Sequence, residues 1–506
     1  MYHFLDFLHK HLVDTSLSAF FIFYIIVYIL DSRFGLINRI LITAKRLAVS
    51  KAFLVVFFLF SFLVVSFFSK YILQEFQNTG SEYAYIFQAQ NLYHGKLWAQ
   101  VPRQDFFSIE GIVPMDGKDV ARVFPGWPFL LTAAMFLHIP LWLVNPILAT
   151  LSLLAAFLLG KLIYNETIGL LSAIAILFSP FYIFNAASFV PHISCALFIL
   201  LAVYFFCSFY LKNYSGSLIF GMGICLGASY LIRPFSTFAC LVPLLAALMI
   251  KRKSSFFFRD IWYFLLGMAP FLLINYWYNF HITGNAFLSP FNWTDPQDTI
   301  QFHRSIILEN FFTMQKQFLW MNPAIFIMYF FTIMFFVFKR KIQAYEFIFL
   351  ILMASCFFYF APGVSYGARY YYEGYSLCMI TVLGRLSRLE KGILKRLLTI
   401  GVVAGFFISL MISAGFAKHY RSRIHYRNEV YRLANDKGLS NAIVFLPPDL
   451  HTSVRDARND PDLHNAVLYA HDLGRKNFLL KKDFPTRVFW RYIPEARTED
   501  QRLLQF

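Results

Sequence analysis

Residues 52–73 read AFLVVFFLFSFLVVSFFSKYIL, a run in which Lys70 is the single charged side chain. An α-helix needs about 20 mainly apolar residues to cross the hydrocarbon core of a bilayer, so this run is predicted to span a membrane. The whole 506-residue chain resembles it, with 58% hydrophobic and 14% charged residues and a mean hydropathy of +0.56. Soluble domains carry about 25% charged residues. The composition therefore excludes a cytosolic enzyme and predicts an α-helical polytopic membrane protein.

Further apolar runs bring the predicted number of spans to about 12. These runs lie at 16–30, 141–160, 168–185, 193–211, 216–232, 235–250, 261–278, 321–338, 345–361, 374–387 and 397–415. Basic residues gather in alternate loops, for example in 31–51, 251–253, 339–341 and 385–396. By the positive-inside rule these loops face the cytoplasm, which places the polar stretch 74–124 and the tail on the outer side.

The net charge of +17 would suggest a nucleic-acid partner in a soluble protein. Here the cytoplasmic loops and a basic tail account for the charge, so no nucleic-acid binding is expected. Six cysteines all fall inside apolar runs without metal-ligand spacing, and they are interpreted as packing residues. These are Cys195, Cys207, Cys225, Cys240, Cys356 and Cys378.

Three segments are predicted. Residues 1–51 form an extra N-terminal span and a cytoplasmic linker, and residues 52–417 form a transmembrane module with a large outer loop at 74–140. Residues 418–506 are more polar, with three strand-like runs at Ala442–Leu446, Ala466–Ala470 and Val488–Tyr492. Turn signals separate these runs, so a small outer α/β domain is predicted.

The outer loop carries the first candidate for chemistry. Residues 81–95 read SEYAYIFQAQNLYHG, where Glu82, Tyr85, Gln88 and Leu92 share a helical face. This predicts an amphipathic helix on the membrane surface, with Glu82 above the bilayer. Glu82 is either a solvated surface residue or a general base that deprotonates an acceptor hydroxyl. A second short interfacial helix is predicted over 124–137.

Four more acids and two cations follow in the same loop: Asp105, Glu110, Asp116 and Asp119 with Lys118 and Arg122. Three further cationic candidates, His192, Arg233 and Arg369, stand at the outer ends of spans. Lipid phosphates are natural partners for cations at such a boundary. The alternative is pairing with a local carboxylate such as Glu373, or snorkelling.

These motifs resemble those of the GT-C fold glycosyltransferases, in particular the protein O-mannosyltransferase and aminoarabinose transferase-like enzymes that use polyprenyl-phosphate sugars. The resemblance rests on E-x-x-Y-x-x-Q-A-x-x-L-x-x-G from Glu82 to Gly95 and on PGWP-x-LL from Pro125 to Leu131. Further matches are Ser188 to His192, Leu231 to Pro234 and Gly367 to Tyr370, and the set extends over 50–500.

The resemblance implies an inverting, metal-independent or weakly metal-dependent transfer, which leaves a divalent metal open as a cofactor. Ser81 stands where the family usually has an Asp base, so Glu82 itself, or Asp105, Glu110, Asp116 or Asp119, would be the catalytic carboxylate. Arg369, Arg233, Lys118, Arg122, His192 and Tyr85 would bind the donor and its phosphate.

The function expected is transfer of a sugar from a polyprenyl-phosphate donor to a hydroxyl of a glycolipid, polysaccharide or protein. Surrounding membrane lipids are the other partners expected. The expected location is a bacterial inner membrane, with the active site facing the periplasm. Two alternatives remain: a non-catalytic lipid or polysaccharide transporter or flippase, and an inactive protein that keeps the fold.

Overall fold

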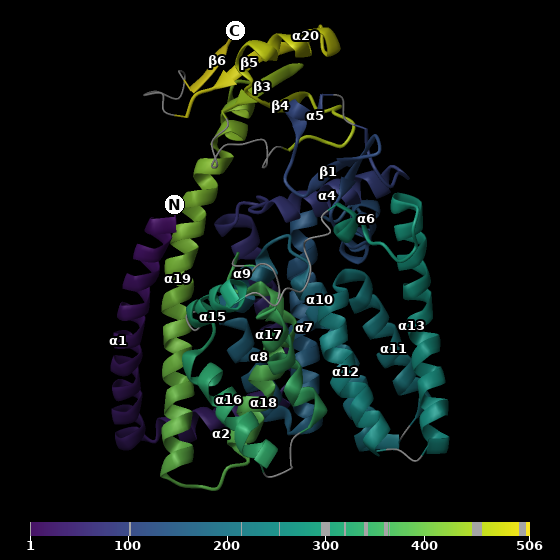
Figure 1. Ribbon diagram of the computed structural model, residues 1–506. Helices are drawn as coiled ribbons and strands as arrows, with labels where there is room; N and C mark the ends of the chain where they lie inside the picture. Colours follow the sequence, from purple (N-terminus) through teal and green to yellow (C-terminus); the bar gives the residue numbers. More distant parts are fainter. Residues whose placement is uncertain are drawn as a thin grey trace. The chain divides into compact units, whose positions relative to one another are not determined.

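The computed structural model describes residues 2–100, 103–213, 215–251, 254–294, 304–317, 320–338, 343–358, 363, 365–447, 458–494 and 502–506, and Figure 1 labels its elements. The chain forms two compact units. The helical unit comprises residues 1–69, 145–274 and 298–418. The mixed unit comprises residues 70–144, 275–297 and 419–506.

The helical unit contains, wholly or for the most part, the longer helices of the chain. They are α1 (Tyr2–Phe34), α2 (Leu36–Val49), α3 (Lys51–Phe67), α7 (Leu141–Ile163), α8 (Glu166–Leu177), α9 (Pro180–Ala187), α10 (His192–Ser208), α11 (Gly216–Ile232), α12 (Pro234–Lys251), α13 (Ser254–Thr283), α15 (Arg304–Gln317), α16 (Pro323–Phe338), α17 (Ile348–Cys356), α18 (Tyr375–Ser387) and α19 (Ile393–Asp436). Short helical turns are η2 (Phe209–Asn213), η3 (Ala344–Phe347) and η4 (Arg369–Gly374).

The membrane-protein prediction is confirmed by helices that are long and apolar enough to cross a bilayer. Among the described residues there are 5 such helices: 51–72, 141–163, 192–211, 258–283 and 393–436. Two bent pairs, 18–34 with 36–49 and 166–177 with 180–187, would raise the number to 7. The predicted number of about 12 is not confirmed, because most of the other predicted spans fall on apolar helices of at most 17 residues. A 17-residue helix is only about 25 Å long, near the lower limit for a span.

Small residues allow close packing inside the helical unit. A Cβ on Gly223 of α11 would lie 2.3 Å from the carbonyl oxygen of Phe264 in α13, and a Cβ on Gly267 would lie 2.3 Å from that of Phe220. Only glycine permits this approach, which is the usual way in which helices pack closely within a bilayer. Helices α10, α11 and α12 lie side by side in the same unit (Figure 1).

The mixed unit combines short helices with two sheets. Its elements are η1 (Phe68–Ile72), α4 (Gly80–Tyr93), α5 (Gln104–Phe107), β1 (Ile112–Met115), β2 (Lys118–Ala121), α6 (Gly126–Phe136), α14 (Pro290–Thr294), β3 (Ala442–Leu446), β4 (Val467–His471), η6 (Gly474–Leu479), α20 (Leu480–Asp483), β5 (Val488–Tyr492) and β6 (Leu503–Gln505). Helix α6 matches the predicted interfacial helix closely.

The larger sheet has the strand order β4-β3-β5-β6, in which β3 is parallel to β4 and β5, and β6 is antiparallel to β5. Strands β3, β4 and β5 fall on the three strand-like runs of the sequence, with β4 shifted by one residue. Every residue of β3 is buried, as expected for a central strand covered on both faces. Phe106 and Phe107 of α5 share this core with Phe445 and Phe489.

Candidate functional site

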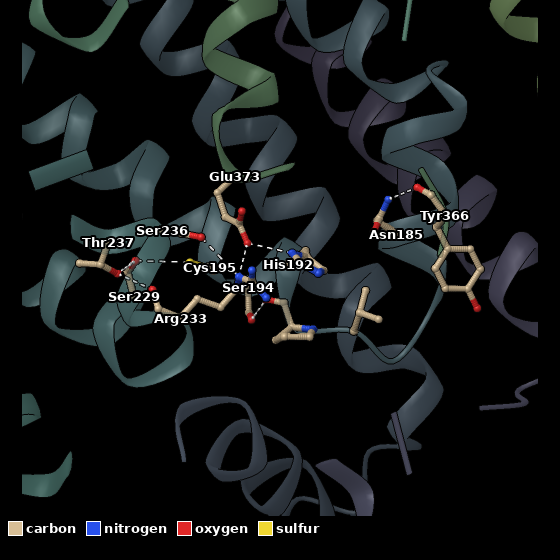
Figure 2. Close-up of polar contacts among 12 residues, drawn as sticks. Asn185, His192, Ser194, Cys195, Ser229, Arg233, Ser236, Thr237, Tyr366 and Glu373 are labelled. Atoms are coloured by element: carbon tan, nitrogen blue, oxygen red, sulfur yellow. Dashed lines mark hydrogen bonds and ion pairs between the residues drawn. The ribbon is translucent and has the colours of Figure 1, made fainter. Parts of the chain in front are cut away.

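A buried carboxylate, Glu373 in η4, organises the polar cluster of the helical unit (Figure 2). The Nε of Arg233 lies 2.8 Å from Glu373 Oε1, and the Nδ1 of His192 lies 2.9 Å from the same oxygen. Glu373 is fully buried and His192 is 1% exposed. The local-carboxylate interpretation is thus confirmed for Arg233 and His192.

Breaks between helices place these two side chains. Helix α11 ends at Ile232 and α12 begins at Pro234, so Arg233 stands at the junction, where its backbone N–H donates to the carbonyl of Ser229 at 2.8 Å. The hydroxyl of Thr237 donates back to the Arg233 carbonyl at 3.0 Å. These bonds tie the backbone of Arg233 to the helices on both sides of the break at Pro234.

His192 begins helix α10, and the loop before it is held by the buried Asn145 of α7. The side-chain amide of Asn145 donates to the carbonyls of Ser188 and Val190 at 2.6 and 2.9 Å. In the same way, the Asn185 amide donates to the Tyr366 carbonyl at 2.9 Å, which ties α9 to the segment that precedes η4 (Figure 2). The positions of His192 and η4 are therefore both fixed by buried amides.

Arg369 adds a second guanidinium to this cluster. Its guanidinium carbon lies 5.8 Å from the ring centre of Tyr370, and that of Arg233 lies 5.4 Å from the same ring. Among the described residues, Arg369 Nη1 and Glu373 Oε2 are buried without a hydrogen-bond partner. The cluster thus holds two guanidiniums, of which only Arg233 is paired with Glu373, and it keeps an excess of positive charge whatever the state of His192. Such a surplus suits an anion with several oxygen acceptors.

Glu82 lies in the mixed unit, in the first turn of α4, where it is fully buried. Its Oε2 accepts a hydrogen bond of 2.6 Å from the backbone N–H of Asn78, and the Thr79 hydroxyl accepts one of 3.4 Å from the Glu82 N–H. This arrangement is close to a capping box. Arg427 of α19 donates to both the carbonyl and the side-chain oxygen of Asn78 at 2.8 Å. Glu82 therefore also helps to cap the N-terminus of α4.

Helix α4 differs from the predicted surface helix in one respect. It occupies the predicted residues, but consecutive side chains from Glu82 to Ala84 are all buried, so burial is not confined to one face. Tyr85 is half-buried beside a small core formed by Ala84, Phe87, Ala99, Ala121 and Val123. The description as an amphipathic helix is wrong, because neighbouring segments cover α4 on several sides.

The other acids of residues 74–140 occupy different environments. Asp105, Glu110 and Asp116 are exposed, whereas Asp119 is only 4% exposed. Asp116 and Gly117 form a two-residue hairpin turn between β1 and β2, with φ of 50° and 74°. An Asp-Gly pair is the common sequence for such a turn, so this pair could have predicted the hairpin.

Asp119, in contrast, lines a pocket of about 60 Å³ with Phe107, Ser108 and Asp460. The two loop cations lie over aromatic rings, Lys118 at 4.3 Å from Trp98 and Arg122 at 4.9 Å from Phe291. Among the residues that the structure describes, no group of three or more His, Cys, Asp or Glu side chains could hold a metal ion.

The structure thus brings three predicted donor-binding residues, His192, Arg233 and Arg369, into one cluster of the helical unit. Lys118, Arg122, Tyr85 and the five acids lie in the mixed unit. Glu373 was considered in the sequence only as a possible local partner, yet it is the residue that joins the cluster. The sequence feature that could have pointed to Glu373 is its position four residues after Arg369.

A search against models of known protein families found no match, and a search of curated proteins found none. Solved structures do match. ArnT from Cupriavidus metallidurans bound to undecaprenyl phosphate is similar with a TM-score of 0.53 at 11% identity, covering 88% of this chain and 94% of that one. The apo state of ArnT is similar with a TM-score of 0.54 at 10% identity, and the match covers 87% of this chain and 92% of that one. The archaeal oligosaccharyltransferase AglB from Archaeoglobus fulgidus has a TM-score of 0.49 at 10% identity, and the match covers 86% of this chain and 69% of that one.

The matches to ArnT extend over nearly the full length of both chains, and ArnT has the GT-C fold of membrane glycosyltransferases. This chain therefore has the GT-C fold, and the fold expected from its motifs is confirmed.

Proposed function

We propose that the protein is a membrane glycosyltransferase that moves a sugar from a polyprenyl-phosphate donor to an acceptor hydroxyl, with inversion at the anomeric carbon. The observation that carries this proposal is the cluster of the half-buried Arg233 and Arg369 around the buried Glu373, whose positive charge exceeds its negative charge. The GT-C fold, shared with a protein solved with undecaprenyl phosphate bound, supports a lipid phosphate as the anion.

The cluster would hold the donor phosphate before and during the transfer. The acceptor oxygen attacks the anomeric carbon while the bond from that carbon to the phosphate oxygen breaks. The electron pair leaves with the polyprenyl phosphate, which gains negative charge. Arg369 and Arg233 would stabilise this charge, with Glu373 holding Arg233 in place. Fixed cations in a site poor in water are well suited to that task.

The proton of the acceptor hydroxyl requires a base, and we assign this role to Glu82. The hydrogen bond that Glu82 Oε2 accepts from the Asn78 backbone N–H fixes the direction of this carboxylate at the start of α4. Asp119 is the second choice because it is buried beside a pocket, and Asp105, Glu110 and Asp116 remain further candidates. The acceptor would be a glycolipid, a polysaccharide or a protein, approached from the periplasmic face of a bacterial inner membrane.

A turnover assay tests the proposal. Purified protein in nanodiscs is mixed with a panel of polyprenyl-phosphate sugars and with candidate acceptors, and mass spectrometry measures the released polyprenyl phosphate. Wild type should release it, and Glu82→Gln should lower the rate by about 10²–10⁴-fold, the usual effect of losing a general base. Glu75→Gln, which alters a half-buried acid of the same loop, serves as the control and should keep the wild-type rate.

Other outcomes would change the assignment. Release that survives Glu82→Gln but is lost in Asp119→Asn would move the base to Asp119. Tight binding of polyprenyl phosphate without release from any donor would contradict the enzyme and favour a transporter or an inactive protein.

A further inference from the structure

The helical unit contains a cavity of about 620 Å³ that the proposed reaction does not use. Its walls come mainly from α2, α8, α18 and α19, and most of its lining side chains are aliphatic, such as Ile40, Ile174 and Val403. Pockets that bind small molecules commonly measure about 300–1,000 Å³. An apolar cavity of this size within a membrane protein suits a hydrocarbon chain better than water.

Helix α2 gives this cavity a charged border. The helix turns by 82° from the end of α1, and its Ala44 and Ala48 are buried while Arg39, Lys45 and Arg46 are exposed. Basic amphipathic helices of this kind lie in the interface of a bilayer and are attracted to anionic lipids. Arg39 is one of the residues that line the cavity, so the apolar interior and a basic residue of α2 adjoin each other.

Lys395 places a second cation at the cavity. Its Nζ donates to the carbonyls of Ser387 and Leu389 at 2.7 and 2.9 Å, which fixes the ammonium at the end of α18. The segments that carry Arg39 and Lys395 are both rich in Lys and Arg, and the positive-inside rule places both in the cytoplasmic leaflet.

This cavity is separate from the Glu373 cluster. Helix α18 begins immediately after Glu373 and Gly374, and Leu383, Leu386 and Ser387 near its other end line the cavity. A helix of 13 residues is about 20 Å long. The two places therefore lie near opposite ends of the same helix.

We propose that the cavity binds one acyl chain of an anionic glycerophospholipid of the cytoplasmic leaflet, with the lipid phosphate at Arg39 and Lys395. The apolar walls fit the chain and the two cations fit the phosphate. A zwitterionic phospholipid should bind more weakly, because its own ammonium group is repelled by these two cations. The inference does not depend on glycosyl transfer.

Native mass spectrometry of the full-length protein in detergent tests the site. The protein is titrated separately with phosphatidylglycerol, phosphatidylethanolamine and undecaprenyl phosphate. One phosphatidylglycerol per chain should bind more tightly than phosphatidylethanolamine. Arg39→Gln should weaken it roughly fivefold, the effect of one basic residue near an anionic lipid surface. Lys45→Gln, an exposed residue of α2 that does not line the cavity, should leave the affinity unchanged.

A second variant tests the cavity rather than the charge. Ala175 of α8 lines the cavity and is only partly buried, so Ala175→Phe should fill part of the space and remove the tightly bound phospholipid. Equal losses in Arg39→Gln and Lys45→Gln would overturn the site, as would full retention of the lipid in Ala175→Phe. Binding of undecaprenyl phosphate that is tighter than that of phosphatidylglycerol and is lost in Ala175→Phe would assign the cavity to a polyprenyl chain instead.

Discussion

Glu373 of the helical unit and Glu82 of the mixed unit are both fully buried carboxylates, but they are stabilised in different ways. Glu373 meets Arg233 and His192, which are distant in sequence, and Arg369 adds a further positive charge. Glu82 accepts a hydrogen bond from a backbone N–H four residues away. A carboxylate compensated by cations belongs to a charged cluster that can exchange partners with a ligand. A carboxylate bonded to local backbone is held as part of its helix.

The largest effect on stability is expected from Glu373→Gln. The substitution leaves the half-buried Arg233 guanidinium without its carboxylate, and breaking a buried ion pair costs about 3–5 kcal/mol. The midpoint of thermal unfolding in detergent should fall by several degrees. The double variant Glu373→Gln with Arg233→Gln should recover much of the loss because it removes the uncompensated charge. An unchanged midpoint in the single variant would show that Glu373 is not what balances the cluster.

A smaller effect is expected at the start of α4, where the stabilisation is local. Thr79→Ala removes the side-chain cap of the helix, a loss of about 1 kcal/mol. Hydrogen exchange of the backbone amides at the start of α4 should speed up roughly fivefold, while Thr79→Ser should exchange as wild type does. Equal exchange in Thr79→Ala would mean that Arg427 and Asn78 alone hold this turn.

The smallest effect concerns a partly exposed carboxylate of the mixed unit. The hydrogen bond from Lys96 lowers the pKa of Asp462 below its ordinary value of 3.8, at an Nζ to Oδ1 distance of 2.8 Å. Because the pKa is lower in the folded state, the pair stabilises the protein at pH values above 3.8, and this stabilisation is lost as the pH falls through the lowered pKa.

Both side chains of this pair are partly exposed, so the contribution is only a few tenths of a kcal/mol. Asp462→Asn should thus lower the unfolding midpoint slightly at pH 7, and the difference from wild type should shrink at pH 3. A difference in unfolding midpoint between Asp462→Asn and wild type that grows as the pH falls would contradict the lowered pKa of Asp462.

The sequence predicts those features that depend on neighbours along the chain. The apolar run at 52–73, the strands β3 and β5 and the short helix α6 were all expected from composition and turn residues. The break at Arg233 was predicted as well, since Pro234 cannot continue α11. The hairpin at Asp116-Gly117 was not predicted, although this residue pair could have indicated it in the same way.

Features that depend on distant partners were not predictable in the same way. The burial of α4 on several sides is set by the segments that pack on it, and periodicity does not report these. The role of Glu373 requires Arg233 and His192 to meet η4 in space. A single sequence offered Glu373 as one candidate partner among several, and only the fold shows that one carboxylate serves two side chains and leaves Arg369 in excess.

The most direct test of the account is the affinity for undecaprenyl phosphate of wild type, Arg369→Ala and Arg369→Lys, with Glu82→Gln as the matched control. Hydrogen bonds to charged groups contribute about 1.5–3 kcal/mol, so Arg369→Ala should weaken binding about tenfold to a hundredfold. Arg369→Lys should lie between, because Lys keeps the charge but loses the two-pronged geometry. Glu82→Gln should bind as wild type does. Wild-type affinity in Arg369→Ala would contradict the claim that the excess positive charge at Glu373 holds the donor phosphate.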